Sequence, residues 1–240
     1  MALVWSLLFV DPLIILSTTF FGLISVLISL FDSTGRTQIK VARLWARSLL
    51  RLAGVRVTAV GLCKLDANAS YVFASNHLSY MDTPVMLSYI PAQFRFLAKS
   101  GLFKIPLLGT HLTQAGHIPV PLEDARAAVR TLTRAAKAIR EKSVSLLIFP
   151  EGGRSDDGVL QPFRDGGAYI AIKAQVPLVP VALIGTRGIL AMHSATFHRG
   201  RVTLRVGDPI PTVGLTLRDR RALTEQARAQ IVAMLRSGSK

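Results

Sequence analysis

The sequence predicts an α/β fold in which a mixed, largely buried β-sheet is flanked by helices and preceded by membrane-associated helices. Two observations predict it. From residue 55 onward, short apolar runs alternate with stretches of helical period, whereas residues 13–31 contain no charged side chain. A chain of 240 residues can bury one sizeable core. We therefore expect N-terminal membrane-associated helices over residues 1–53 and one α/β domain over residues 54–240.

The first element is the apolar segment 13–31, LIILSTTFFGLISVLISLF. At about 1.5 Å per residue, such a helix approaches the ~30 Å thickness of the hydrocarbon core of a bilayer. A cleaved signal peptide is the competing interpretation, but Asp11 and Pro12 lie early and no basic residue precedes the run. The segment is therefore expected to stay in the membrane. It either spans the bilayer once or enters and returns as a helical hairpin, and length does not separate these options.

A basic amphipathic helix is predicted next. Its cations recur every three or four residues and so share one face: Arg36, Lys40, Arg43, Arg47 and Arg51. The opposite face carries apolar residues that include Val41, Leu44 and Trp45, and Gly54 is a suitable stop. Such a helix suits an anionic bilayer surface, and the positive-inside tendency places the following domain on the cytoplasmic face of the inner membrane. The alternative is an ordinary surface helix with a solvated basic face.

Six strands are predicted after this helix, from short apolar or alternating runs. They cover residues 55–60, 71–75, 94–98, 145–149, 177–183 and 202–206. Helical periodicity marks residues 123–142 and 218–236. The single cysteine, Cys63, excludes a disulfide within the chain and is expected to be buried as a small apolar residue.

Polar clusters follow two of these strands at their carboxyl ends, where open α/β sheets usually carry their sites. The first is NHLSYMD, residues 76–82. A histidine titrates near neutrality and can take a proton from an alcohol during acyl transfer. Five residues turn about 140° on a regular helix, but at a strand-to-helix turn Asp82 can fold back to the ring of His77 and fix its tautomer. The alternative is helix capping by Asn76 or Ser79 beside an incidental histidine.

The second cluster is FPEGGRS, residues 149–155. The consecutive glycines Gly152 and Gly153 let backbone N–H groups approach an anion, and these groups are also candidates to stabilise an oxyanion. Arg154 offers a planar fork of donors for a phosphate. Glu151 is a candidate to orient Arg154 or to bind a substrate hydroxyl. The alternative is a tight turn whose charged residues face water.

Together the two clusters resemble blocks of the glycerophospholipid acyltransferase family, specifically the 1-acylglycerol-3-phosphate acyltransferases, and the resemblance covers nearly the whole chain. The family's asparagine-histidine pair, followed after four residues by aspartate, matches Asn76, His77 and Asp82. Its phenylalanine-proline-glutamate-glycine-threonine-arginine-serine block matches residues 149–155, except that Gly153 replaces the threonine. The resemblance implies the glycerolipid acyltransferase-like α/β fold.

One block departs from the family pattern. The stretch that carries Lys99 follows the family's course, but members commonly continue with aspartate-arginine where this chain has Pro121-Leu122. The departure leaves phosphate recognition to Lys99 and Arg154, with Arg126 as a distant candidate.

The resemblance implies transfer of a fatty acyl group from acyl-CoA or acyl carrier protein to the sn-2 hydroxyl of lysophosphatidic acid, which makes phosphatidic acid for phospholipid biosynthesis. His77 is then the base and Asp82 its partner. The expected substrate-binding residues are Asn76, Lys99, Glu151, Gly152, Gly153 and Arg154. The thioester is a co-substrate, so no cofactor is expected. The other histidines form no ligand pattern with carboxylates, so no catalytic metal is expected either. The acyl chain is expected in an apolar groove formed by parts of 97–109 and the N-terminal helices.

The net charge of +15, from 29 Lys and Arg against 14 Asp and Glu, points to an anionic partner. Nucleic acid is not the expected partner, because no recognition module is found, aromatic residues make up 7% of the chain and much of the charge follows the membrane segment. A non-catalytic protein that binds anionic membranes explains the charge but gives the two polar clusters no task. Within the enzyme class, the alternative is acylation of another lysophospholipid or of glycerol 3-phosphate.

Overall fold

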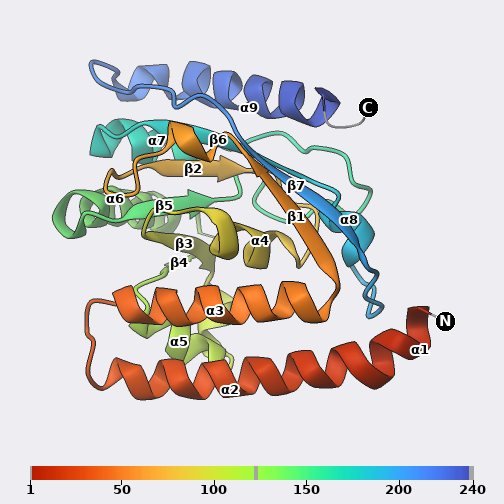
Figure 1. Ribbon diagram of the computed structural model, residues 1–240. Helices are drawn as coiled ribbons and strands as arrows, with labels where there is room; N and C mark the ends of the chain where they lie inside the picture. Colours follow the sequence, from red (N-terminus) through yellow and green to blue (C-terminus); the bar gives the residue numbers. More distant parts are fainter. Residues whose placement is uncertain (1, 122–123, 238–240) are drawn as a thin grey trace.

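The computed structural model describes residues 2–121 and 124–237. Its centre is a seven-stranded sheet of order β1-β7-β6-β2-β5-β3-β4 (Figure 1). The strands are β1 (Val55–Val60), β2 (Val72–Ser75), β3 (Phe94–Lys99), β4 (Ile118–Val120), β5 (Ser145–Ile148), β6 (Leu178–Ile184) and β7 (Gly200–Val206). Neighbouring strands are parallel except β6 and β7, which are antiparallel. The predicted mixed sheet is confirmed.

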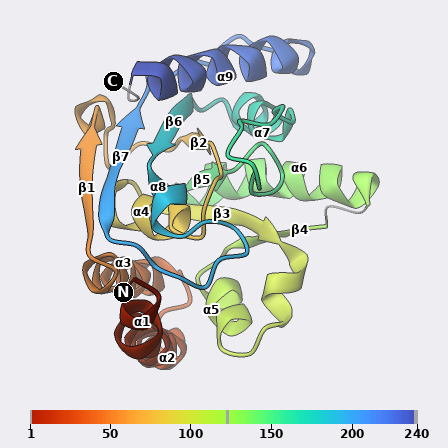
Figure 2. The same cartoon turned by 90° about the vertical axis from the view of Figure 1, so that its right-hand side faces the viewer.

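Helices cover both faces of this sheet (Figure 2). One face carries α3 (Arg36–Leu52) and α4 (Asp82–Tyr89), and the other carries α6 (Ala125–Lys142), α7 (Gly166–Ala174) and α9 (Arg220–Ser237). A long N-terminal helix, made of α1 (Ala2–Trp5), the π-helical turn η1 (Ser6–Val10) and α2 (Asp11–Ser29), lies outside α3. Shorter elements are η2 (Leu62–Lys64), η3 (Ser100–Lys104), α5 (Leu108–Gln114), α8 (Thr186–Ile189) and η4 (Leu217–Asp219).

The central strand β2 divides the core. Phe73 packs with the cluster that contains α3 and α4, whereas Val72 and Ala74 pack with the cluster of α6, α7 and α9. All four residues of β2 are buried, as expected for a parallel strand with helices on both sides. The segment that follows β2 therefore emerges from the middle of the sheet, beside the ends of β5 and β6.

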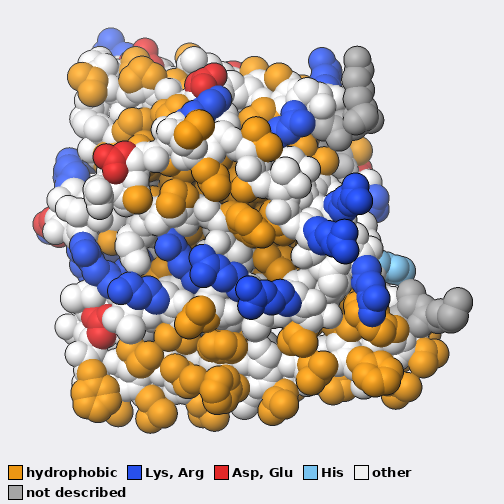
Figure 3. Space-filling view, in the orientation of Figure 1, with side chains coloured by type: hydrophobic (Ala, Val, Ile, Leu, Met, Phe, Trp, Pro, Cys, Tyr) orange, Lys and Arg blue, Asp and Glu red, His pale blue; other side chains and the backbone are white. Residues whose placement is uncertain are grey.

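The N-terminal hairpin consists of α2 and α3, which run antiparallel (Figure 1). The Ser17 and Ser48 hydroxyls are 2.9 Å apart, and Trp45 Nε1 donates to Thr18 Oγ1 at 3.0 Å. By length and composition, the helix Leu3–Ser29 is able to cross a membrane. Its outer surface is apolar and lies below a row of Lys and Arg side chains (Figure 3).

The predicted boundary between residues 53 and 54 falls in the turn that joins α3 to β1. The hairpin is nevertheless not detached from the rest of the chain. Ala46, Leu49 and Leu50 of α3 are buried in the same cluster as Phe73 of β2. The N-terminal helices and the sheet therefore share one continuous apolar core.

Two side chains of α3 differ from the sequence prediction. Leu44, predicted on the apolar face, is 53% exposed. Arg43, predicted on the basic membrane face, turns inward, and its Nη2 donates to Ile90 O at 2.8 Å and Ala92 O at 2.6 Å. Carbonyls at the end of a helix have no intrahelical donor, so the end of α4 attracts this guanidinium.

Three further details depart from the sequence-based expectation. Cys63 is exposed because it lies in η2, the turn after the edge strand β1. Strand β4 was not predicted. The helix predicted over 123–142 begins at Ala125, where Asp124 caps it by accepting from Ala127 N at 2.9 Å, and residue 123 lies outside the described residues.

Candidate active site

The first cluster forms a tight turn between β2 and α4. His77 Nδ1 lies 2.8 Å from Asp82 Oδ2. The same carboxylate oxygen accepts from Leu78 N at 2.7 Å and Ser79 N at 2.9 Å. Asp82 is fully buried at the start of α4, and its charge also faces the positive end of that helix. The structure therefore brings His77 and Asp82 together, as a strand-to-helix turn allows.

Burial sets the electrostatics of His77, which is 8% exposed. Its ring stacks on Phe149 of the second cluster, with ring centroids 3.7 Å apart and planes 9° from parallel. Burial lowers the pKa of the imidazole below its ordinary value of 6.5, Asp82 opposes this shift, and the positive charge of Arg154 adds to it. At neutral pH the ring is uncharged. Because the Asp82 carboxylate accepts the Nδ1 hydrogen, Nε2 keeps its lone pair.

Glu151 ties the two clusters together. Its Oε1 accepts from His77 N at 2.6 Å, and its Oε2 accepts from Gln161 N at 2.8 Å. The side chain is 8% exposed, and burial raises the pKa of this carboxyl above its ordinary value. Sequence reasoning expected Glu151 to orient Arg154 or to bind a substrate hydroxyl. The structure instead shows both of its oxygens bonded to backbone N–H groups, one of which is that of His77 itself.

The side chain of Asn76 also bonds to backbone atoms. Its side-chain amide donates to Leu183 O at 2.9 Å and accepts from Leu183 N at 2.8 Å. The residue is fully buried. Asn76 thus joins the end of β2 to β6, and a positioning role suits it better than the predicted substrate contact.

Arg154 lies on the same side of the molecule as His77. The next residue, Ser155, donates its N–H to His77 O at 3.0 Å. The guanidinium carbon of Arg154 lies 4.3 Å from the ring centroid of Tyr80, a cation–π contact. Burial lowers the pKa of this guanidinium. Its buried Nε has no hydrogen-bond acceptor among the described residues. Tyr80 was not singled out from the sequence, although it lies inside NHLSYMD.

The two glycines of the second cluster are not equivalent. Gly152 N donates to Phe149 O at 3.1 Å, so this N–H closes the turn and is not free for an oxyanion. Gly152 also has φ +81°, and a Cβ there would lie 3.0 Å from Nε of Arg164. Gly153 is exposed, and a Cβ added to it would meet no described atom within 4 Å. Of the two predicted oxyanion donors, Gly153 N–H is therefore the better candidate.

Lys99 is the last residue of β3, which pairs with β5 in parallel. It is exposed and reaches the same sheet edge as the cluster after β5. Pro121 follows β4 at this edge too, while Leu122 lies outside the described residues. The distant candidate Arg126 is exposed in the first turn of α6.

An apolar cavity of about 410 Å³ lies between the N-terminal hairpin and α4 and α5. Its walls include Phe21 and Trp45 from the hairpin and Ile105 and Leu108 from the segment around α5. Thr83, the neighbour of Asp82 in the chain, also lines it. The predicted groove between residues 97–109 and the N-terminal helices is thus present as a cavity that reaches the start of α4.

Among residues 2–121 and 124–237, no group of three or more His, Cys, Asp or Glu side chains is arranged to hold a metal ion. The groups that the two clusters bring to this edge are an uncharged imidazole, a buried carboxylate, a guanidinium and a backbone N–H.

The acyltransferase family model matches residues 56–184, more than half of the chain and a range that contains both polar clusters. The 1-acyl-sn-glycerol-3-phosphate acyltransferase alpha of Homo sapiens is 29% identical over 199 residues, which are 83% of this chain and 70% of the human protein. The chloroplastic 1-acyl-sn-glycerol-3-phosphate acyltransferase BAT2 of Brassica napus is 35% identical over 172 residues, 71% of this chain and 49% of the plant protein.

The fold has a counterpart among solved structures. The 1-acyl-sn-glycerophosphate (LPA) acyltransferase PlsC of Thermotoga maritima superposes with a TM-score of 0.74 at 24% identity, covering 93% of this chain and 95% of that chain. At this identity the likeness concerns the fold. The family model, which matches over both clusters, shows that the chain belongs to the acyltransferase family.

Proposed function

We propose that the protein transfers a fatty acyl group from an acyl thioester to the sn-2 hydroxyl of 1-acyl-sn-glycerol 3-phosphate and so makes phosphatidic acid. The observation that carries the proposal is the contact of His77 Nδ1 with Asp82 Oδ2 at 2.8 Å, on the same sheet edge as Arg154. Relatives that match over both clusters are named 1-acyl-sn-glycerol-3-phosphate acyltransferases. The thioester is a co-substrate, and no cofactor is required.

The geometry supports direct transfer without an acyl-enzyme. Nε2 of His77 accepts the hydrogen of the substrate hydroxyl while the hydroxyl oxygen attacks the thioester carbonyl carbon. The C–S bond then breaks, and the departing thiolate takes the proton from the imidazolium. Asp82 fixes the tautomer and stabilises the imidazolium between the two proton transfers. The Gly153 N–H is the proposed donor to the tetrahedral oxyanion.

The phosphate of the acceptor is assigned to Arg154, with Lys99 completing the charge. The Tyr80 contact fixes the plane of the guanidinium, which reduces the rotamer freedom that binding would otherwise have to remove. The buried Arg154 Nε is a donor with no acceptor among the described residues, and a phosphate oxygen is a suitable one. Lys99 reaches this edge at the end of β3, which neighbours β5 on the side away from β2.

The acyl chain is assigned to the apolar cavity between the hairpin and α4. Its volume of about 410 Å³ and its mainly aliphatic and aromatic walls suit a flexible hydrocarbon. Thr83 joins this wall to the turn that holds His77 and Asp82, so a chain in the cavity starts close to the reacting carbonyl.

The hairpin is assigned to the membrane surface. Because α2 bonds to α3 at Thr18, and to α5 through Ser25 and His111 at 2.6 Å, it lies against the domain along its length. This arrangement supports a hairpin embedded from one side over a helix that stands alone across the bilayer. The exposed apolar residues of α2 then enter the cytoplasmic leaflet of the inner membrane, and the basic row of α3 meets its headgroups (Figure 3).

The test is a lysolipid panel assayed with the full chain in membranes and a labelled acyl donor, supplied either as acyl-CoA or on acyl carrier protein. We expect phosphatidic acid from 1-acyl-sn-glycerol 3-phosphate with at least one donor. Preferential acylation of neutral lysolipids or of glycerol 3-phosphate would refute the acceptor assignment. Using both donors identifies the thioester without affecting that outcome.

A further inference from the structure

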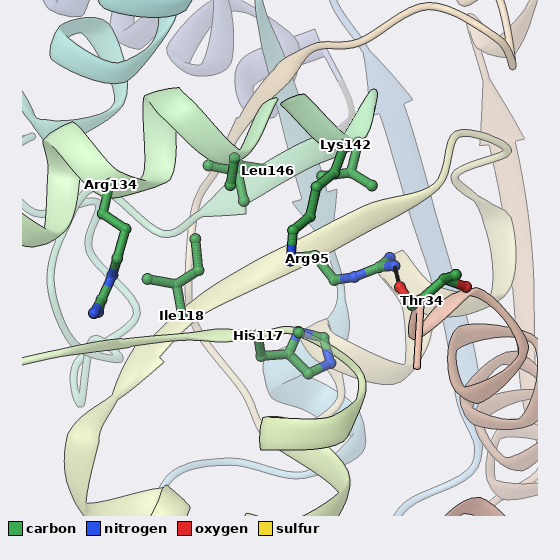
Figure 4. A pocket seen from close by; sticks show the side chains of 10 residues that line it. Thr34, Arg95, His117, Ile118, Arg134, Lys142 and Leu146 are labelled. Carbon is green, nitrogen blue, oxygen red and sulfur yellow. Dashed lines mark hydrogen bonds between the residues drawn. The ribbon is translucent and has the colours of Figure 1, made fainter. Parts of the chain in front are cut away.

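A second polar cavity lies away from the candidate active site. It has a volume of about 240 Å³, and Arg95, Arg134 and Lys142 line it together with Thr34 and His117 (Figure 4). Arg95 is the second residue of β3 and pairs with Leu146, the second residue of β5. His77 and Arg154 instead follow the carboxyl ends of their strands. The cavity therefore lies near the amino ends of the strands, whereas the candidate active site lies at their carboxyl ends.

Arg95 is a buried cation with neutral partners. It is 3% exposed, and its guanidinium donates to Phe94 O at 3.0 Å, Gln93 Oε1 at 3.2 Å and Thr34 O at 3.3 Å. No carboxylate of the described residues lies within 4.0 Å of it. Burial, reinforced by the charge of Arg36, lowers its pKa to about 10. A buried charge that lacks an opposite charge is costly for a fold to keep.

The rest of the cavity adds to the positive charge. Arg134 and Lys142 are exposed on α6, and both side chains extend from that helix toward the cavity (Figure 4). His117 Nδ1 accepts from Phe96 N at 2.8 Å, and burial holds the pKa of this ring well below its ordinary value, so the uncharged ring carries its hydrogen on Nε2.

Asp32 and Glu141, acids of the two elements that border this cavity, already have partners. Asp32 Oδ1 accepts from Thr34 N at 2.7 Å, and Asp32 Oδ2 accepts from Thr37 N at 2.8 Å. Its charge acts on Arg95 less strongly than that of Arg36 does. Glu141 on α6 pairs with Lys137 at 3.5 Å. The cavity therefore presents several N–H donors of positive charge without a carboxylate among its lining residues.

We propose that this cavity binds a phosphate group, with Arg95 at its floor and Arg134 and Lys142 at its mouth. Phosphate matches the planar fork of a guanidinium and the point charge of an ammonium better than a neutral ligand does. Thr34 belongs to the turn between α2 and α3, beside the apolar surface of the hairpin. A phospholipid headgroup and a soluble phosphate are therefore both able to supply the same chemistry.

The site does not depend on the proposed acyl transfer, so binding and not catalysis tests it. The thermal unfolding midpoint of the full chain, in an uncharged detergent, is measured against inorganic phosphate at constant ionic strength. It is then measured in micelles that contain phosphatidylglycerol in place of phosphatidylcholine. The test variant combines Arg134→Gln with Lys142→Gln, and both residues are exposed. The matched control combines Arg130→Gln with Lys173→Gln, one arginine and one lysine that are exposed and lie outside the cavity lining.

We expect at least one phosphate source to raise the midpoint of the wild type. Loss of the two charged donors is expected to weaken its apparent affinity about tenfold in the test variant and less than about twofold in the control. Phosphate that binds beside Arg154 shifts the unfolding midpoint equally in all three proteins. A response to inorganic phosphate identifies a soluble ligand, and a response to phosphatidylglycerol alone identifies a headgroup. No response in the wild type, or equal weakening in the two variants, overturns the proposal.

Arg95→Met provides a second check. The substitution removes a buried charge that lacks an opposite charge, which favours folding, but it also takes a donor from the carbonyls of Phe94 and Thr34, which disfavours it. The response to phosphate is therefore measured as the shift of the variant's own midpoint. Its response to phosphate is expected to disappear. A variant that keeps the full response contradicts the assignment of Arg95 to the floor of the site.

Discussion

The polar turn after β2 and the N-terminal hairpin both border the candidate active site, but they are held together differently. In the turn, buried carboxylates make specific hydrogen bonds: Asp82 Oδ2 accepts three N–H groups and Glu151 accepts two, whereas Asp82 Oδ1 has no partner among the described residues. In the hairpin, apolar side chains make most of the contact, supported by a few hydroxyl bonds such as Ser17 to Ser48. The turn therefore depends on residue identity, whereas the hairpin depends on side-chain volume and apolar character.

The strongest test of this contrast is His77→Ala. Removing the base is expected to reduce kcat/KM for acyl transfer by about 1,000-fold, because no described side chain is placed to replace it. Turnover is measured with the protein bound to vesicles. The control is His198→Ala, an exposed histidine, which is expected to keep wild-type turnover. Both variants should stay on the membrane, since neither touches the hairpin. Full turnover by His77→Ala would remove the histidine from the mechanism.

A smaller loss is expected from Asp82→Asn. The amide preserves the shape of the turn and still accepts one or two of the N–H bonds, but it does not stabilise an imidazolium. We expect kcat to fall about 100-fold while KM changes little. The control is Asp208→Asn, which removes a carboxylate that pairs with Lys64 at the surface. A raised KM with unchanged kcat would show that Asp82 acts on binding instead.

On the hairpin side, Gly22→Leu tests whether volume matters. Gly22 lines the apolar cavity, and a Cβ at this position would lie 2.7 Å from Leu107 Cδ2. The larger side chain is expected to displace Leu107 and to narrow the cavity. Activity with long-chain acyl donors is expected to fall about tenfold, and activity with short-chain donors less. Gly101→Ala, where the added Cβ meets nothing within 4 Å, is the matched control. An equal loss for all chain lengths would argue against the cavity as the chain site.

The smallest effect on activity is expected for His111, which joins the hairpin to α5. Burial lowers the pKa of His111 from 6.5 to about 4. The unfolded chain therefore binds a proton that the folded chain does not, and stability falls as the pH falls through this interval. The contribution of His111 is about 2 kcal/mol between pH 7 and pH 5.

Denaturant unfolding of wild type and His111→Asn at the two pH values measures this contribution. The asparagine keeps a polar group near Ser25 but does not titrate. The variant is expected to lose less stability on acidification than the wild type. An identical loss in both proteins would place the titrating group elsewhere.

Sequence patterns predicted the fold well where burial is continuous. The run YVFAS is apolar on both sides of β2, which matches a central strand between two helical layers. The pattern was uninformative for β4, since Ile118–Val120 has three residues and contains a proline. The inward turn of Arg43 was missed because helical spacing assigns a face but not a partner on another helix.

Within the site, the meeting of His77 and Asp82 was predictable because both lie in one short turn. The roles of Glu151 and Asn76 were not, because their partners are backbone atoms of other segments, His77 N and Leu183. The same limit applies to α2. Its composition suits a spanning helix and a surface hairpin alike, and the contacts with α3 and α5, which support the proposed hairpin, lie between segments far apart in the sequence.

The pH dependence of kcat/KM tests the central claim, that a buried, uncharged His77 is the base. Because kcat/KM reports the pKa of the free enzyme, and burial lowers the pKa of His77 below 6.5, activity is expected to hold at neutral pH and to decline on the acid side with an apparent pKa below 6.5. Asp82→Asn is expected to move this limb to still lower pH, since Asp82 raises the pKa of the ring. A rate that does not decline on the acid side, or a limb that Asp82→Asn leaves in place, would contradict the account.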